Sequence, residues 1–224
     1  MTQLEKSVTA APNMPLKPPT FGAWLDCGEV NRLVRTISDT GEEAVEFRAN
    51  EAAIARWLKW STGLSTAQIV QMPSTVGRAI YGRLIPTIPS MSYAKPSIGD
   101  PVKPVGDGIE IKLIDPIVGH QGAISVLKLR HPTFGDVIKA GDIATLRVMK
   151  TTALGEEVPS TEEVINIDAV GNWFETLSAT PLTLLRSMSY RDAHLCFAHL
   201  KPLVSEIADA NFDEPSLISG SRAA

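Results

Sequence analysis

The chain has 224 residues, of which 44% are hydrophobic and 21% charged, a composition typical of a folded globular protein. Its formal charge of −4 provides no basic field that would attract nucleic acid or anionic lipid. No run approaches the ~20 apolar residues of a membrane span, and Met1 to Pro19 lacks the apolar run of a signal peptide. We therefore expect no nucleic acid and no membrane as partner, and a protein that stays where it is made.

The most informative feature is an internal repeat. Residues 16–22 and 129–135 share the pattern Leu-basic-x-Pro-Thr-Phe-Gly, and the likeness continues downstream after a small insertion. The matched positions include the pairs Trp57/Trp173, Met72/Met188, Leu84/Leu200 and Pro86/Pro202. Such a long period indicates a tandem duplication of one structural unit, with two similar domains of ordinary size.

The first half of the chain is predicted to be helical. Residues 1–15 are expected to be a flexible lead-in, and residues 16–88 a first helical unit. The apolar spacing predicts a helix from Thr20 to Thr36, interrupted at Gly28, and then a short extended piece from Ala44 to Phe47. Three further helices are expected to begin at Asn50, at a capping box on Ser65, and at Ser74.

The second half is predicted to add a β-hairpin. Prolines and glycines recur in residues 89–108, which predicts a linker. A second unit, 109–208, is expected to start with the hairpin, because apolar and charged residues alternate in 109–113 and a second apolar run covers 124–129. Its helices are expected to begin at Thr133, Ser160 and Ser189, and residues 209–224 to be a flexible tail. The expected fold class is α+β, mainly α, with two similar small helical units, the second preceded by the hairpin.

Histidines and cysteines do not form a metal site on this sequence. His194 and His199 are five residues apart on one predicted helix, so their rings point in different directions, whereas zinc helices place two histidines at i and i+4. Cys27 and Cys196 are aligned with small or apolar residues in the other copy of the repeat. We expect both to be buried free thiols.

The carboxylates that attract attention have a structural explanation. Asp136, Glu163 and Asp192 each stand three residues after a predicted helix cap, where an acidic side chain satisfies free backbone N–H groups and complements the helix dipole. The glycines form no phosphate-binding loop with a Lys-Ser or Lys-Thr ending. We therefore expect that the protein is not an enzyme and has no catalytic residues, no cofactor and no metal.

One segment suggests DNA binding as an alternative. Residues 64–84 have the pattern of a helix-turn-helix, in which Arg78 and Arg83 would face phosphates. The equivalent segment of the second half puts Asp192 and His194 on its second helix, and the whole chain is acidic. A helix-turn-helix regulator is kept as an alternative function.

The second half also has a family likeness. A strand leads into Leu129, Arg130 and Pro132, and a helix start that carries an aspartate follows. Residues 177–182 come next, and then a Met-Ser-x-x-Asp helix start at 188–192. This order resembles the small tail assembly chaperone family of Mu-like and related contractile-tailed phages. The resemblance covers residues 109–207 and, through the repeat, extends to 16–88. The family members are typically single units, and residues 179–180 depart from the usual Gly-Leu.

The resemblance implies a function in tail assembly. Proteins of this family are non-enzymatic and keep the tape measure protein soluble in the host cytoplasm while the tail tube assembles, so the tape measure protein and other tail proteins are the expected partners. Two linked units would raise the effective concentration on a repetitive partner. Our hypothesis for the contact is exposed apolar residues of the hairpin, represented by Ile111 and Val126, or of the Pro-Thr-Phe-Gly helix. The alternative is a structural tail or baseplate component retained in the virion. The sequence leaves the oligomeric state open.

Overall fold

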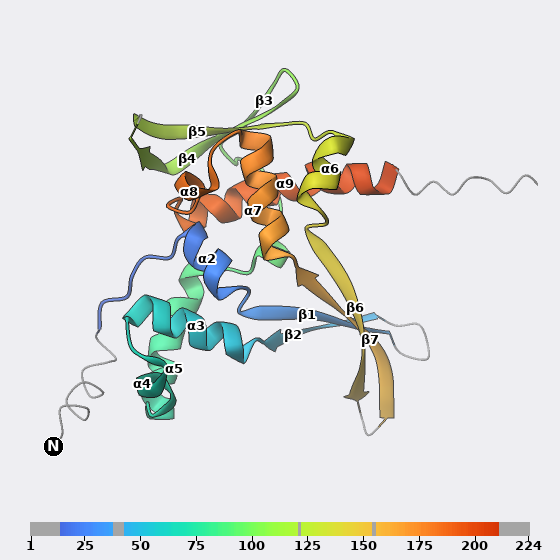
Figure 1. Ribbon diagram of the computed structural model, residues 1–224. Helices are drawn as coiled ribbons and strands as arrows, with labels where there is room; N and C mark the ends of the chain where they lie inside the picture. Colours follow the sequence, from blue (N-terminus) through green and yellow to red (C-terminus); the bar gives the residue numbers. More distant parts are fainter. Residues whose placement is uncertain (1–13, 38–42, 121, 154–155, 211–224) are drawn as a thin grey trace, which may run out of the picture.

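The computed structural model describes residues 14–37, 43–120, 122–153 and 156–210 (Figure 1). The elements of the first half are α2 (Phe21–Cys27), β1 (Asn31–Ile37), β2 (Glu43–Ala49), α3 (Glu51–Thr62), α4 (Thr66–Val70) and α5 (Ser74–Leu84). The middle of the chain contains the short 3-10 turns η2 (Ile85–Thr87) and η3 (Met91–Tyr93) and the strands β3 (Val102–Val105), β4 (Gly108–Gly119) and β5 (Gly122–Arg130). The elements of the second half are α6 (Phe134–Ala140), β6 (Ala144–Ala153), β7 (Glu156–Ile165), α7 (Ile167–Ser178), α8 (Leu182–Leu185) and α9 (Tyr190–Ala210).

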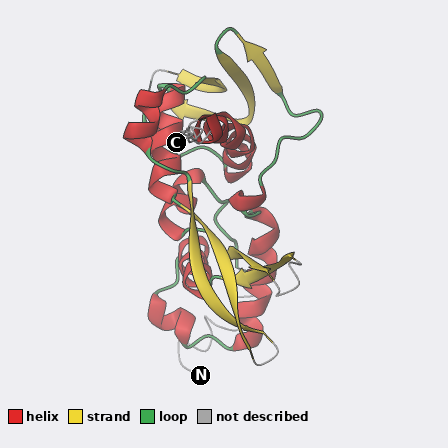
Figure 2. Cartoon of the chain, turned by 90° about the vertical axis from the view of Figure 1, so that its right-hand side faces the viewer, coloured by secondary structure: helices red, strands yellow, loops and turns green. Residues whose placement is uncertain are grey.

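The strands form two antiparallel sheets. The first, called the joint sheet below, has the order β2-β1-β7-β6 and takes two strands from each half. The second, called the hairpin sheet, has the order β3-β4-β5. Figure 1 shows α7, α8 and α9 between the two sheets, and Figure 2 shows helices on both sides of the long strands. The expectation of a mainly α fold with two small helical units is therefore wrong, because strands from both halves build one sheet.

Two segments expected to be helical are strands. The helix that begins at Phe21 ends at Cys27, because Gly28 has a φ of 80° and leaves the helical region, and the chain continues as β1. Ser160, expected to cap a helix, lies within β7. Both strands pair with segments distant in sequence: β1 lies between β2 and β7, and β7 lies between β1 and β6. The apolar residues of a short segment suit either a helix or a strand, and the pairing partners decide between them.

The two halves are built alike. Each has the element order α-β-β-α-α-α, and an asparagine side chain caps the start of both α3 and α7. The indole N–H of Trp57 donates to the carbonyl oxygen of Gly28 at 2.9 Å, and that of Trp173 donates to Gly141 at 2.7 Å. The same hydrogen bond therefore connects the turn after the first helix to the long helix in each half.

One hydrophobic core serves both halves. Helix α2 of the first half inserts Phe21 into the second half, where its ring meets Phe174 of α7 edge-on at a centroid distance of 5.2 Å. Next to it, the backbone N–H of Gly22 donates to the carbonyl oxygen of Arg186 at 2.9 Å. A Cβ atom on Gly22 would lie 2.8 Å from that oxygen, so only glycine allows this approach.

Residues 89–108, predicted to be a linker, are packed against both halves. The side chains of Met91 and Ala94 are 0% and 3% exposed. The carboxylate of Glu29 accepts hydrogen bonds from the Ser90 hydroxyl at 2.8 Å and from the Met91 backbone N–H at 2.9 Å. Burial raises the pKa of Glu29 in spite of these hydrogen bonds. The end of this segment also forms strand β3 of the hairpin sheet. The segment is therefore a packed part of the fold.

The equivalent tryptophans give a first test. Replacing Trp57 or Trp173 with phenylalanine should lower the free energy of unfolding by about 1–3 kcal/mol in each case, because a glycine carbonyl loses its donor and the core loses volume. Urea denaturation of the two single variants measures both losses. A loss confined to one variant would contradict the equivalent role of the two indoles.

Candidate protein-binding surfaces

The two contact positions expected from the sequence lie on opposite faces of the hairpin sheet. Ile111 pairs with Leu127 and is 0% exposed, so its side chain belongs to the core. Val126 pairs with Lys112, one step further along, and is 37% exposed. Side chains of a strand alternate between the faces of a sheet, and the inward face here packs on the helices. Ile111 is therefore not available to a partner, whereas Val126 is.

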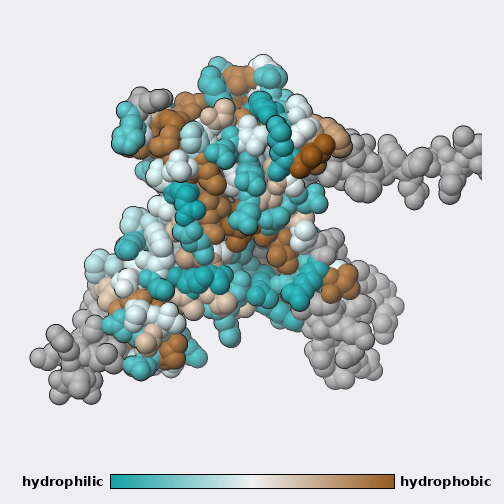
Figure 3. All heavy atoms as spheres, in the orientation of Figure 1, coloured by the Kyte–Doolittle hydropathy of each residue, from teal (hydrophilic) through white to brown (hydrophobic). Residues whose placement is uncertain are grey.

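The hairpin sheet exposes further apolar side chains. Ile114 is 47% exposed and Val118 is 78% exposed, both on β4. Figure 3 shows apolar side chains at the surface over this sheet. A single exposed apolar residue is ordinary, but several on one small sheet are typical of surfaces that bind another protein. The residues Ile114, Val118 and Val126 are called the hairpin surface below.

A buried aspartate holds the hairpin surface in place. Asp192 at the start of α9 is 0% exposed, and its carboxylate accepts hydrogen bonds from the backbone N–H groups of Ile114 at 2.8 Å and Asp115 at 2.9 Å. The ladder between β4 and β5 is irregular between Lys112 and Ile117, so these N–H groups are free of the ladder and point to α9. Asp192 also accepts from the Ser189 hydroxyl at 2.8 Å, as expected near a helix start. Its main contact, with β4, could not be inferred from local spacing.

We expect Asp192→Asn to destabilise the protein. The amide group cannot accept at both positions, so a buried N–H of β4 loses its partner at a cost of about 1–3 kcal/mol. Asp142→Asn, a change at an exposed position, is the matched control and should alter stability by less than about 0.5 kcal/mol. Urea denaturation measures both values, and equal stabilities of the two variants would refute the role given to Asp192.

Helix α6 presents a second apolar surface. Phe134 is 63% exposed and Ile138 is 72% exposed, whereas Phe21, the equivalent of Phe134 in the first half, is 0% exposed. Figure 3 also shows apolar side chains at the surface beside α6. The same helix is thus covered in one half of the protein and uncovered in the other.

A charged contact fixes the start of α6. The guanidinium of Arg130 binds both carboxylate oxygens of Asp136, at 2.7 and 2.8 Å. The backbone N–H and the hydroxyl of Thr133 donate to the same carboxylate at 2.7 and 2.8 Å. The Arg130 guanidinium, helped by Thr133, holds the pKa of Asp136 well below its usual range. The capping role expected for Asp136 is confirmed, and the arginine is an addition that the sequence reasoning missed.

The lowered pKa of Asp136 predicts a pH dependence. The native state keeps this carboxylate charged at pH values where the unfolded chain, with an ordinary aspartate pKa of about 3.9, takes up a proton. The stabilisation is therefore present above about pH 4 and is lost as the pH falls further toward the native pKa. Urea denaturation between pH 3 and 7 should show a steeper acid loss for the wild type than for Asp136→Asn, and parallel curves would contradict the prediction.

Among the residues that the structure describes, the joint sheet has two open edges. Strand β2 lies at one end and β6 at the other. On β2, Val45 is 52% and Phe47 53% exposed, and on β6, Val148 is 77% exposed. An edge strand with apolar side chains can pair with a further strand, because its outer N–H and C=O groups have no partner in the sheet.

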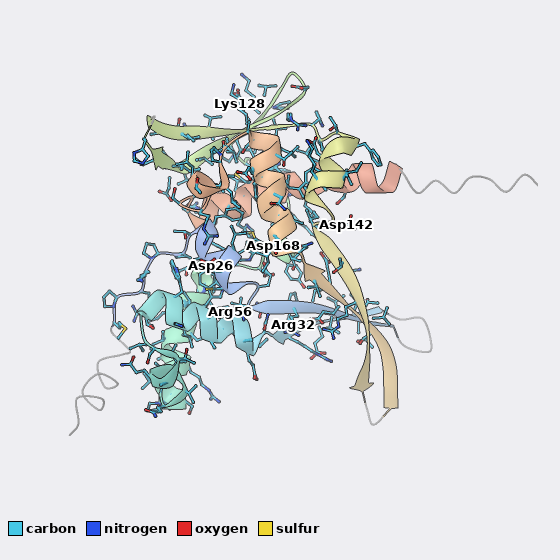
Figure 4. The ribbon with its side chains drawn as sticks, in the orientation of Figure 1. Asp26, Arg32, Arg56, Lys128, Asp142 and Asp168 are labelled. Carbon is cyan, nitrogen blue, oxygen red and sulfur yellow. The ribbon has the colours of Figure 1, made fainter. Side chains whose placement is uncertain are left out.

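The charged residues at the junction of the halves pair with each other. A cavity of about 190 Å³ lies between the joint sheet and α3, and its lining includes Arg32 and Arg56, which are labelled in Figure 4. Arg32 lies 3.4 Å from Glu162, and Arg56 donates to the Cys27 carbonyl oxygen at 2.9 Å. These contacts connect β1, β7, α2 and α3, so we interpret the cavity as part of the framework and not as a ligand site.

The histidines and cysteines also have structural surroundings. His194 lies 3.2 Å from the Ser90 carbonyl oxygen, and His199 lies 2.8 Å from Asp100, so α9 contacts the 89–108 segment through two different residues. Within the described ranges, no group of three or more His, Cys, Asp or Glu side chains is arranged to hold a metal ion. Cys27 and Cys196 are buried free thiols, as expected, and burial raises the pKa of Cys27 to about 11.

The segment with the helix-turn-helix pattern does form two helices, α4 and α5. Arg78 of α5 is exposed. In the second half the corresponding second helix, α9, is a core helix, since Cys196 and Phe197 are both 0% exposed. At least one of the two helix pairs is therefore used for packing.

Comparison with known proteins returns no relative: no family model, no curated protein and no solved structure matches the chain. The likeness to tail assembly chaperones rests on the sequence motifs alone. In the described part of the chain, no helix is both long enough and apolar enough to cross a membrane. The function must therefore be argued from the surfaces themselves.

Proposed function

We propose that the protein is a non-enzymatic tail assembly chaperone that binds the phage tape measure protein and keeps it soluble in the host cytoplasm. The observation that carries the proposal is the hairpin surface, where Ile114, Val118 and Val126 are exposed on a sheet that Asp192 fastens to the core. A fixed apolar surface can bind the apolar stripe of a client helix without a large loss of its own conformational freedom. The sequence motifs supply the identity of the client.

The position of the hairpin sheet supports a binding role. Its inward side, with Ile111 and Leu127, packs on the helices, and its exposed residues are therefore presented by a supported layer. The surface also carries charge, because Lys128 and Glu110 form an exposed ion pair at 2.6 Å across the strands. An apolar centre with a charged rim is the usual composition of a protein–protein contact.

The test is co-expression with the tape measure protein encoded by the same phage or prophage. We expect the wild type to keep the client soluble and to co-purify with it. Val118→Asp and Val126→Asp should each reduce the co-purified client strongly, because the loss of a central apolar contact costs about 2 kcal/mol or more. Ala79→Asp, which places the same charge on an exposed position in the middle of α5, is the matched control and should behave as the wild type.

Each result of this experiment has a clear meaning. Loss of client binding with an unchanged circular dichroism spectrum and melting temperature supports the hairpin surface. Full retention of the client by both hairpin variants would exclude this surface. A client that precipitates in the presence of the wild type would exclude the chaperone function.

A structural tail or baseplate component is the second candidate. The open edges of the joint sheet favour it, because a component retained in a particle needs surfaces for lasting contacts. Quantitative analysis of purified particles separates the two functions: a chaperone is absent from finished particles, and a structural component is present in fixed stoichiometry.

A further inference from the structure

The two halves of the chain are joined head to tail. Strand β1, the first strand of its hairpin, pairs with β7, the second strand of the other hairpin. A twofold arrangement would bring like strands together, β1 with β6 or β2 with β7. The observed junction instead pairs the first strand of one hairpin with the second strand of the other. The two edges of the joint sheet therefore also differ: one edge is a first strand, β6, and the other is a second strand, β2.

From this geometry we infer that a second copy of the chain repeats the junction. Within the chain, strand β1 pairs with β7, and helix α2 docks on the turn between α8 and α9. Between copies, strand β6 of one copy pairs in the same way with β2 of the next, and helix α6 docks on the turn between α4 and α5. Because the contact is head to tail, each copy keeps one free end of each kind, and the assembly grows into a ring or a filament. This inference does not depend on the proposed chaperone function.

The strand register supports the contact. Both hairpins have matching ladders, in which Asn31 opposite Ala49 corresponds to Ala144 opposite Ile165. The junction pair Val34 and Glu162 then corresponds to Arg147 of one copy opposite Glu46 of the next. Opposite charges on facing residues stabilise a strand pair.

The next pair in the register is apolar. The junction pair Arg35 and Thr161 corresponds to Val148 of one copy opposite Val45 of the next. Val148 is 77% exposed and Val45 is 52% exposed in the single chain. Two β-branched residues that are exposed at opposite ends of one sheet would thus cover each other.

Helix α6 has the residues that α2 uses for docking. Within the chain, Phe21 and Gly22 donate their backbone N–H groups to the carbonyl oxygens of Met188 and Arg186, both at 2.9 Å. The equivalent residues of α6 include Phe134, which is 63% exposed. Their acceptors in the next copy would be the carbonyl oxygens of the turn after α4.

The receiving turn has the same shape in both halves. The backbone N–H of Met72 donates to Ile69 at 3.1 Å, and that of Met188 donates to Leu185 at 3.0 Å. Val70, which stands where Arg186 stands in the second half, is 78% exposed. The turn after α4, which would accept the hydrogen bonds, therefore already has the required shape, and Val70 in it is exposed.

Gly135 is the most specific indication. At Gly22 a Cβ atom would lie 2.8 Å from the Arg186 carbonyl oxygen, so the docking within the chain requires glycine. At Gly135 a Cβ atom would meet no described atom nearer than the Thr133 hydroxyl, at 3.7 Å, so no contact in the described part of the chain requires glycine there. Glycine in a helix is unfavourable relative to alanine. Docking of α6 on another copy accounts for it.

The first test is Gly135→Ala. Light scattering coupled to size-exclusion chromatography should show that the mass of the purified wild type rises with concentration above the 24.1 kDa of one chain. The variant should need a concentration about tenfold higher or more for the same mass, since its Cβ collides with the Val70 carbonyl of the next copy. Its melting temperature should be equal or higher, because alanine favours the helix.

Gly82→Ala is the matched control. Gly82 is an exposed position of α5 where a Cβ atom would meet none of the described residues within 4 Å, so this variant should assemble as the wild type does. A wild type that stays at the mass of one chain at every concentration would overturn the inference. Assembly of Gly135→Ala equal to that of the wild type would also overturn it, because the contact would then lie elsewhere.

A cross-link tests the register directly. In the variant Val45→Cys/Val148→Cys, the two cysteines lie on opposite edges of the four-stranded joint sheet, about 14 Å apart at ~4.8 Å per strand, which is too far for a disulfide within one chain. Mild oxidation should give a ladder of covalent multimers on a denaturing gel. Val45→Cys/Thr75→Cys should give no such ladder, and a ladder in this control alone would contradict the register.

Discussion

The docking of α2 on the second half is the contact on which the rest of the structure depends. It buries Phe21 and Trp24, whose rings stack at a centroid distance of 5.9 Å, in a core built largely by α7 and α9. The approach is close enough to exclude a Cβ atom at Gly22. Because α2 leads through a short turn into β1, the same docking places β1 beside β7, and the joint sheet follows. The halves therefore cannot separate without exposing aromatic surface and breaking a strand ladder.

Two carboxylates, the partly buried Glu29 and the buried Asp192, make the halves different from each other. Glu29 holds the 89–108 segment against the first half, and Asp192 holds the hairpin sheet against the second. Their equivalents in the repeat, Asp142 and Val76, have no such task in the described structure. The hairpin sheet is thus an addition to the repeated halves, and it carries the hairpin surface. Each carboxylate accepts hydrogen bonds from backbone N–H groups of an irregular segment, which would otherwise be left without an acceptor.

The proposed client binding and the inferred self-assembly involve separate parts of the molecule. The hairpin surface belongs to the added sheet, whereas the edges β2 and β6 and helix α6 belong to the repeated framework. A head-to-tail array would therefore present one hairpin surface per copy at a regular spacing. Such an array suits a long client with repeated binding sites, since each further contact is made at a high effective concentration.

The sequence by itself determined the local features. Each copy of the Pro-Thr-Phe-Gly motif, the capping box at Ser65 and the alternation within each strand of the β4–β5 hairpin depend on residues a few positions apart. A cap or a tight hairpin is decided by neighbouring backbone and side-chain groups, and these are visible in the sequence. The structure agrees with the sequence at each of these points.

Only the tertiary structure decided the rest. Residues 31–37 and Ser160 became strand because each segment found partners on both sides, and a segment's own apolar spacing does not report such partners. The same holds for Ile111, which is apolar like Val126 but lies on the inward face, and for Asp192, whose main partners are 78 and 77 residues away in the chain. Pairing and burial are properties of the whole assembled chain, and they set which residues remain at the surface for a partner.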